Sequence, residues 1–218
     1  MSAITGMFLI NGRAVDSNLF KKMNDSLRHR GPDGSGIWVN GPVALGHQML
    51  HTTSESLHEK LPFKDETSGL VITADARIDN RDELAPLLKL ENSEKVSDSL
   101  FILRSYQKWG DKCPEKLLGD FAFAIWDTVK EQLFCARDHM GIKPFYYYLS
   151  DDAFYFATEI KSLFNLLDVH PRLNELRVAY HLIIKFVDEL TFYENIISLT
   201  AAHSLKIDHK GNDILRYW

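Results

Sequence analysis

The sequence predicts an α+β domain, because segments typical of strands and segments typical of helices occur in separate blocks along the chain. Short apolar runs rich in β-branched and aromatic residues recur, and Gly, Asp and Asn separate them, which is typical of many strands. Other stretches have apolar side chains at helical spacing. The two kinds of segment do not alternate strictly, so the pattern does not favour a parallel sheet.

The strand-like runs cover residues 3–10, 36–39, 43–50, 70–78, 121–127, 132–138, 143–149 and 153–159. The last two are separated by Ser-Asp-Asp and predict a hairpin. The helix-like stretches are 18–30, 98–110 and 174–186, and Gly110 is a natural stop for the second of them. Asn80, followed three residues later by Glu83, predicts a helix N-cap with a reciprocal acid. A further strand-like segment, 204–218, ends the chain.

Length and composition favour a single globular domain, with 218 residues, 45% apolar residues and 25% charged residues. The net charge of -5 provides no basic excess for binding nucleic acid. The longest apolar stretch, VAYHLIIKFV, is interrupted by His181 and Lys185 and is too short to span a membrane. No charged residue precedes Arg13, so the basic region of a signal peptide is missing. We therefore expect a cytoplasmic protein whose two cysteines, Cys113 and Cys135, are reduced thiols.

Four motifs follow one another along the chain: RHRGPDGSG, LLGDFAFAIWD, ARDHMGIKPFYYY and FATEIKSL. Together they resemble the class II glutamine amidotransferase domain of asparagine synthetases, an N-terminal-nucleophile hydrolase, over residues 1–218. The resemblance implies a four-layer αββα sandwich, in which helices flank two stacked antiparallel sheets. It also implies that glutamine is hydrolysed and that the ammonia passes to a second, ATP-using synthetase domain.

The end of the sequence indicates a longer protein. Exposed aromatic residues at a terminus are unusual, and the closing LRYW resembles the link into the synthetase domain. The SGGxDS phosphate-binding loop of that domain is absent from this sequence. We therefore expect a covalently attached or associated synthetase domain as partner, with ATP and Mg²⁺ acting only there. No cofactor or metal is expected in this domain, and the sequence leaves a homodimer open.

Ser2 occupies the position at which the family has a nucleophilic cysteine, and Ala3 replaces a usual glycine. In the family, removal of Met1 exposes the cysteine, whose own α-amine acts as the base; such an amine titrates at about pH 8. A thiol is more nucleophilic than a hydroxyl, yet an N-terminal hydroxyl residue with its own amine is also a known nucleophile. Ser2 thus predicts either a serine nucleophile or a site that has lost its nucleophile.

The stretch DARIDN matches the family's NGEIYN-like segment, which supplies the oxyanion hole. Asp75 replaces the asparagine, Ala76 the glycine, and Arg77 the glutamate that helps to hold the substrate amino group. An ionised carboxylate only accepts hydrogen bonds, so Asp75 would repel the oxyanion, and losing one donor costs roughly a hundred- to thousand-fold in rate. Asp75 and Arg77 lie on one face of the predicted strand, where they pair with each other or Arg77 reaches another acid.

Two further positions concern glutamine itself. LGHQML matches the family's LGHxRL, so Met49 stands where an arginine binds the substrate carboxylate. A thioether cannot pair with a carboxylate. Asp98 does match the family's aspartate that binds the substrate amino group, although it is also a plausible helix N-cap.

The scaffold motifs are intact. Arg30 and Gly31 begin the RGPD loop, which in the family packs beside the site and orders on substrate binding; a simple Gly-Pro-Asp-Gly turn explains the same residues equally well. Asp138 and Gly141 are interpreted as determinants of the turn that carries Lys143, through capping and backbone shape.

Other candidate sites are weaker. His47 and His51 are spaced like two metal ligands, but the glutamate of HExxH is missing and the segment is strand-like, so they are interpreted as core or surface residues. The aromatic run 145–148 is interpreted as part of a packed sheet, because no basic groove accompanies it.

Three functions remain open from the sequence. The first is a non-catalytic amidotransferase-like domain that docks on a synthetase domain, as in relatives that form amides on peptides or small molecules. The second is an active serine amidohydrolase or amidotransferase acting on glutamine or another small amide. The third is the amidotransferase half of an ordinary asparagine synthetase. The joint change at Ser2, Met49, Asp75, Ala76 and Arg77 favours the first.

Overall fold

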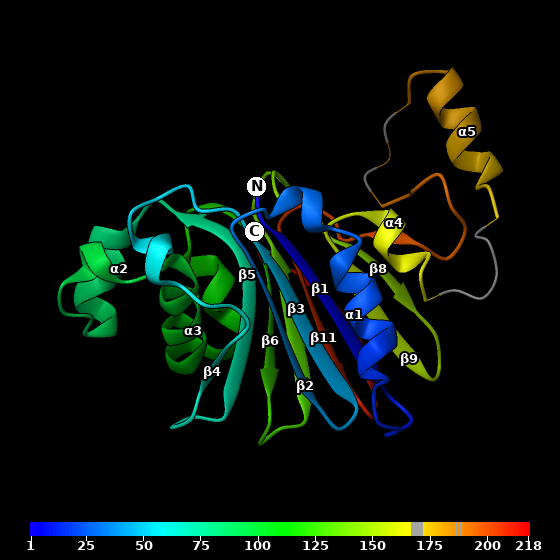
Figure 1. The fold of residues 1–218 in the computed structure, drawn as a ribbon. Coiled ribbons are helices and arrows are strands. Elements are labelled where there is room, and N and C mark those ends of the chain that lie inside the picture. Colours follow the sequence, from blue (N-terminus) through cyan, green and yellow to red (C-terminus); the bar gives the residue numbers. More distant parts are fainter. Residues whose placement is uncertain (167–171, 186, 188) are drawn as a thin grey trace.

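Two six-stranded antiparallel sheets form the centre of the molecule (Figure 1). The structure is a computed structural model that describes residues 1–166, 172–185, 187 and 189–218. In the first sheet the strand order is β10-β8-β9-β1-β3-β2. Its strands are β1 (Ala3–Leu9), β2 (Gly34–Asn40), β3 (Val43–Met49), β8 (Tyr146–Leu149), β9 (Ala153–Ala157) and β10 (Ile197–Ser198).

The second sheet has the order β12-β11-β7-β6-β5-β4. Its strands are β4 (Phe63–Asp65), β5 (Leu70–Ile78), β6 (Gly119–Asp127), β7 (Gln132–Arg137), β11 (His203–Asp208) and β12 (Gly211–Arg216). The predicted strand-like segment at the end of the chain is therefore a hairpin of two strands, β11 and β12, which pair antiparallel.

Helices cover the outer face of each sheet, which gives the expected αββα layering (Figure 1). On the first sheet lie α1 (Ser17–Asp25) and α4 (Ile160–Leu163); on the second lies α3 (Asp98–Trp109), and α2 (Arg81–Leu88) packs against α3. Within the described residues, the connections contain four short 3₁₀ helices, Arg28–Arg30, Glu55–His58, Ser93–Lys95 and Gly110–Lys116. No helix among the described residues is long and apolar enough to cross a membrane.

Alternation along the strands sorts side chains into three apolar layers. On β1, Ile4 and Phe8 face the space between the sheets, whereas Met7 faces α1 and α4. On β5, Val71 faces the other sheet and Ile72 faces α2 and α3. This parity decides which residues reach the space between the sheets, and it continues to the polar residues at the strand ends.

Cys113 and Cys135 are both buried and do not form a disulfide with each other, and burial raises the pKa of each thiol.

One predicted cap, Asn80, is correct in its position but not in its side-chain contact, and the other, Asp98, is wrong. Asn80 does precede α2, but its side chain donates to the carbonyl of Lys116 (3.0 Å) and accepts from the amide of Leu118 (3.0 Å) instead of capping the helix. Asp98 is the first residue of α3, whose N-cap is Ser97. The side chain of Asp98 is therefore free for another contact.

The third predicted helix is shorter than expected. Helix α5 (Glu175–Leu182) ends before Ile184, whose φ of 57° lies in the left-handed region, and residue 186 of the prediction is outside the described residues. No residue of α5 is buried, and the helix stands away from the two sheets (Figure 1).

Candidate active site

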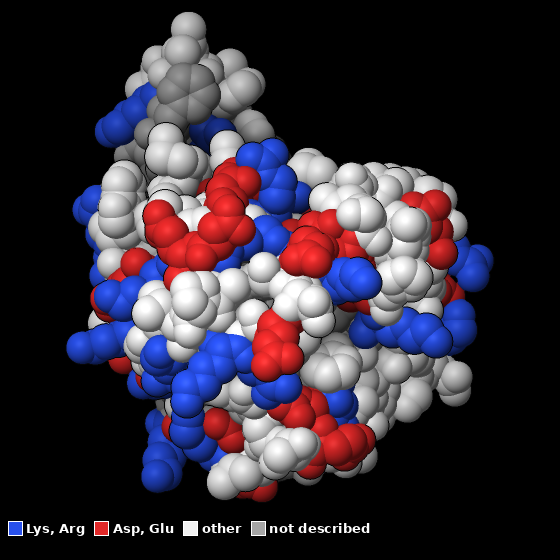
Figure 2. Space-filling view, turned by 90° about the vertical axis from the view of Figure 1, so that its left-hand side faces the viewer, with Lys and Arg blue, Asp and Glu red and all other residues white. Residues whose placement is uncertain are grey.

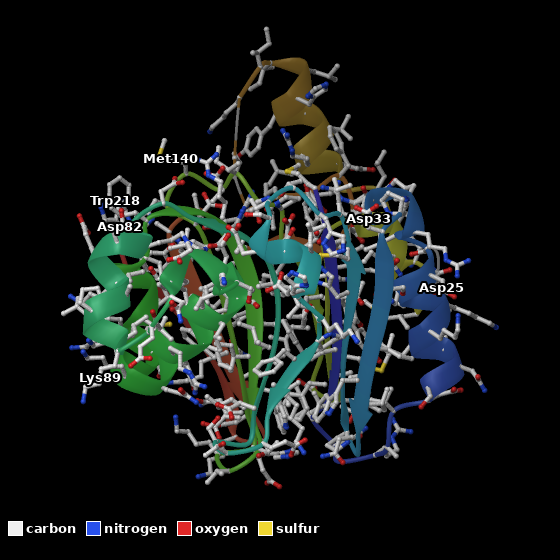
Figure 3. All side chains as sticks on the ribbon, turned by 60° about the vertical axis from the view of Figure 1, so that its left-hand side comes forward. Asp25, Asp33, Asp82, Lys89, Met140 and Trp218 are labelled. Atoms are coloured by element: carbon white, nitrogen blue, oxygen red, sulfur yellow. The ribbon has the colours of Figure 1, made fainter. Side chains whose placement is uncertain are left out.

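A cavity of about 250 Å³ opens between the two sheets, at the end where β1 begins. Six of the residues singled out from the sequence line it, together with Lys143: Ser2, Met49, Asp75, Ala76, Arg77 and Asp98. They come from the ends of β1, β3 and β5 and from the start of α3. The RGPD loop lies at the same end of the molecule, as the position of Asp33 shows (Figure 3).

Ser2 is held at the end of β3. Its hydroxyl oxygen accepts a hydrogen bond from the amide of Leu50 at 3.0 Å and lies 3.4 Å from the carbonyl of the same residue. The sulfur of Met49 is 3.9 Å away. Ser2 is 8% exposed, so its hydroxyl faces the cavity from a fixed position.

Asp75 forms a buried ion pair. Its Oδ1 accepts a hydrogen bond from Nζ of Lys143 at 2.8 Å, while Oδ2 is buried and has no hydrogen-bond partner. Burial raises the pKa of Asp75, and the Lys143 ammonium acts against this rise. The position expected to hold an oxyanion-hole asparagine therefore holds a carboxylate already engaged by a cation.

Arg77 does not pair with Asp75. Its Nε donates to Oδ1 of Asp79 at 2.8 Å, and its side chain is 63% exposed. The two residues share a face of β5, as predicted, but Asp75 lies inside the cavity and Arg77 at its mouth. Of the two options left open by the sequence, contact with another acid is the one observed.

Asp98 is neutralised by a residue that sequence reasoning missed. Nη1 of Arg81 donates to its carboxylate, and Nη2 donates to the carbonyls of Ser93 (2.8 Å) and Val96. Burial raises the pKa of Asp98 to about 6, although Arg81 opposes the shift. The acid expected to hold a substrate ammonium is thus already paired.

His47 also lines the cavity and is only 1% exposed. Its Nδ1 lies 3.2 Å from the hydroxyl of Thr73, and its Nε2 is buried without a hydrogen-bond partner. Burial lowers the pKa of His47 to about 3, with a smaller contribution from His51. The interpretation of His47 as a core residue is correct. His51 lies beyond the end of β3, so the two histidines do not share a strand.

Arg30 and Gly31 lie beside the cavity rather than in its wall. Nη1 of Arg30 donates to Glu159 at 2.9 Å, which joins the RGPD loop to the start of α4. Burial would raise the pKa of Glu159, but hydrogen bonds from Arg30, His29 and Lys161 outweigh it and lower that pKa to about 2. A Cβ on Gly31 would lie 2.2 Å from the carbonyl carbon of Gln48, so only glycine fits against β3.

The turn after β7 positions Lys143. Asp138 accepts hydrogen bonds from the amides of Met140 (3.1 Å), Ile142 (2.9 Å) and Lys143 (2.9 Å), and Gly141 has a φ of 67°. The predicted roles of Asp138 and Gly141 in shaping this turn are therefore confirmed. The turn directs the ammonium of Lys143 back between the sheets to Asp75.

Two further observations concern metal binding and the surface charge of the molecule. Among the described residues, no three His, Cys, Asp or Glu side chains gather in a way that would hold a metal ion. On the face drawn in Figure 2, acidic and basic side chains are intermingled, and that face carries no continuous basic surface.

The glutamine amidotransferase domain model matches residues 1–218, the whole chain. The chain belongs to this family. Glutamine-hydrolysing asparagine synthetase 3 of Bacillus subtilis is 30% identical over 224 residues, which cover 100% of this chain and 36% of that protein. A putative glutamine-hydrolysing asparagine synthetase 2 of Methanocaldococcus jannaschii is 30% identical over 239 residues, covering 100% of this chain and 46% of that protein. This amidotransferase domain thus spans less than half the length of these relatives.

The fold of the domain also matches two solved structures. Glutamine phosphoribosylpyrophosphate amidotransferase of Bacillus subtilis superposes with a TM-score of 0.67 at 16% identity, over 99% of this chain and 49% of that one. A structure described as the allosteric regulatory enzyme of purine biosynthesis gives a TM-score of 0.69 at 17% identity, over 99% of this chain and 49% of that one. At these identities the likeness supports the N-terminal-nucleophile hydrolase fold and nothing about the site.

Proposed function

We propose that this amidotransferase domain does not release ammonia from glutamine and serves as a non-catalytic partner of an attached synthetase domain. The observation that carries the proposal is the ion pair between Asp75 and Lys143, 2.8 Å apart in the cavity wall. A pocket for an acyl-transfer oxyanion needs preorganised hydrogen-bond donors. Here the expected donor is a carboxylate, and the nearest cation is already committed to it.

The contacts needed for glutamine are also missing. Met49 has no charge to offer a substrate carboxylate, and Asp98 is paired with Arg81. Arg77 stands where the family has a glutamate that helps to hold the substrate amino group, and it is paired with Asp79, so this contact is missing too. Weak glutamine binding and an unfavourable oxyanion site are independent defects, so together they argue against hydrolysis more strongly than Ser2 alone.

The attached domain would then take its nitrogen from ammonia or another amine rather than from glutamine. Relatives named asparagine synthetases extend well beyond the aligned region, which supports such a domain. In this proposal ATP and Mg²⁺ act only in the attached domain, and this domain requires neither. We further propose a cytoplasmic location and leave self-association to measurement.

One observation favours the second candidate, an active serine-type amidohydrolase or amidotransferase. The hydroxyl of Ser2 faces the cavity from the N-terminal end of β1, where removal of Met1 would place a free amine. That candidate requires Met1 to be absent from the mature chain, and an intact mass that retains Met1 would exclude it.

The deciding experiment measures ammonia release from glutamine by the purified chain. The comparison set is the wild type, Ser2→Ala, Ser2→Cys, and a restored variant combining Ser2→Cys, Met49→Arg, Asp75→Asn, Ala76→Gly and Arg77→Glu. We expect activity in the restored variant alone. Release of ammonia by the wild type that Ser2→Ala abolishes would overturn the proposal and establish Ser2 as a nucleophile.

A further inference from the structure

We propose that the altered cavity binds a small organic ammonium ion, with its N–H groups on Asp75 and His47 and its apolar body in an adjoining cavity beyond Met49. This inference rests on the proposed function, since it assigns a new ligand class to a pocket that has lost glutamine. Two buried acceptors without donors, an acidic lining and the shape of the space around Met49 support it.

The first acceptor is Nε2 of His47. The hydroxyl of Thr73 donates its single hydrogen to the carbonyl of Gly46 at 3.1 Å, so it can only accept from Nδ1 of His47. The proton of the neutral imidazole therefore lies on Nδ1, and Nε2 presents a lone pair. This tautomer is assigned by the hydrogen-bond network. Nε2 is buried and has no partner within the protein.

The second acceptor is Oδ2 of Asp75. Lys143 occupies Oδ1, and Oδ2 is buried without a partner, although Asp75 is 6% exposed. A buried polar atom left without a hydrogen-bond partner destabilises the structure that contains it. Because both free atoms only accept, a ligand that satisfies them must donate. A carboxylate or an ether has no hydrogen to offer, whereas an ammonium has up to three.

The charge of the lining favours a cation over a neutral donor. Five acidic side chains line the cavity, against two basic side chains and the N-terminal ammonium of Met1, which acts on Asp75. Both basic side chains are engaged, Lys143 by Asp75 and Arg77 by Asp79. The acidic residues are Glu55, Glu59, Asp75, Asp98 and Asp120. Arg81 does not line the cavity, but its guanidinium pairs with two of these acids. Nη1 of Arg81 contacts the carboxylate of Asp98 and lies 3.6 Å from Oε1 of Glu55.

A second cavity of about 640 Å³ adjoins the first and shares His47, Met49 and Glu59 with it. Ile37 of β2 and the apolar side chains of Leu57 and Leu61 line this second space. The flexible thioether side chain of Met49 lies where the two spaces meet. A ligand whose ammonium contacts Asp75 and His47 can therefore extend an alkyl or aryl group past Met49.

Isothermal titration of the purified chain with three six-carbon probes tests the inference: hexylammonium, hexanol and hexanoate. Their apolar bodies match, and only the head group differs. An alkylammonium is fully charged at neutral pH, as Lys is. We expect hexylammonium to bind at least about tenfold more tightly than the other two, a difference of about 1.4 kcal/mol. Equal binding of the three probes, or no binding of hexylammonium at millimolar concentration, would overturn the inference.

Three variants locate the site. Asp75→Asn removes the charged acceptor, and Met49→Arg places a cation between the two spaces, so each should weaken hexylammonium at least about tenfold. Glu83→Gln is the control, because Glu83 is an exposed acid that does not line the cavity. If Asp75→Asn does not fold, the effect of Met49→Arg on hexylammonium binding alone tests the position of the site. An equal loss in Glu83→Gln, or no loss in a folded Met49→Arg, would contradict the proposed position.

A parallel assay with glutamine separates this inference from the proposed function. Ammonia release by the wild type would overturn the proposed function, whatever the amine titrations show. If the wild type neither releases ammonia from glutamine nor binds hexylammonium, only the ligand assignment is overturned and the proposed non-catalytic role is unaffected.

Discussion

The ammonium of Lys143 lies 2.8 Å from Oδ1 of Asp75, and the side chains of the two residues are 11% and 7% exposed. The two residues belong to segments that are distant in the sequence: Asp75 lies on β5, and Lys143 lies in the turn between β7 and β8. Removing two charges from water is costly, and their mutual attraction repays that cost only while both are present. The pair therefore behaves as a unit.

Lys143→Met should destabilise the protein by about 3–5 kcal/mol, because it leaves Asp75 as an uncompensated buried charge. Urea denaturation followed by circular dichroism measures the effect. The double variant Lys143→Met with Asp75→Leu should recover most of the loss, since no buried charge remains. Lys112→Met, at an exposed position, is the matched control. A single variant as stable as this control would show that the pair contributes nothing.

Asp98 should titrate at about pH 6, because burial raises its pKa above the ordinary value of 3.8. The folded state then holds the proton more tightly than the unfolded state. This group therefore makes the protein less stable as pH rises from about 4 to about 6, by up to about 1.4 kcal/mol per pH unit. Carbon-13 NMR of the Asp98 carboxyl group gives the midpoint directly.

The cation beside Asp98 provides a check on that titration. Arg81→Met should raise the midpoint further, because Arg81 favours the ionised carboxylate. Arg28→Met, at an exposed position in the Arg28–Arg30 helix, should leave it unchanged. A midpoint near the ordinary value in the wild type would contradict the structure.

Glu159 should show the opposite pH dependence. Hydrogen bonds from Arg30, His29 and Lys161 outweigh burial and lower its pKa from 4.5 to about 2. Its contribution to stability is therefore complete above about pH 4.5 and is lost as pH falls toward 2. Urea midpoints measured across this range should fall less steeply in Glu159→Gln than in the wild type. Glu83→Gln, at an exposed position, should retain the wild-type slope.

Gly31→Ala should destabilise the RGPD loop, because the added Cβ would lie 2.2 Å from backbone atoms of Gln48. Overpacking against backbone typically costs about 1–3 kcal/mol. Gly34→Ala is a matched control three residues later, since its Cβ would meet Met49 at an ordinary 3.6 Å. Thermal unfolding of both variants measures the difference, and equal melting temperatures would contradict the close approach.

Much of the fold could be predicted from local patterns. Each predicted strand-like run through residue 159 coincides with an observed strand, because apolar and β-branched runs between turn residues have few alternatives. Asn80 is the N-cap residue of α2 as predicted, but neither its side chain nor that of Asp98 caps a helix. Their side chains are polar and reach partners elsewhere in the structure, at Leu118 and Arg81, and helix-capping patterns do not include such partners.

The sequence by itself determined the family, because its motifs are local properties, and the resemblance to that family implied the αββα layering. Only the tertiary structure decided which charges meet. Asp75 and Lys143 are separated by 68 residues, and Asp98 and Arg81 by 17. Strand parity places Asp75 on the inner face, but the turn held by Asp138 decides that Lys143 reaches it. Likewise, Nε2 of His47 is recognisable as an unpaired acceptor only once Thr73 and Gly46 lie beside it.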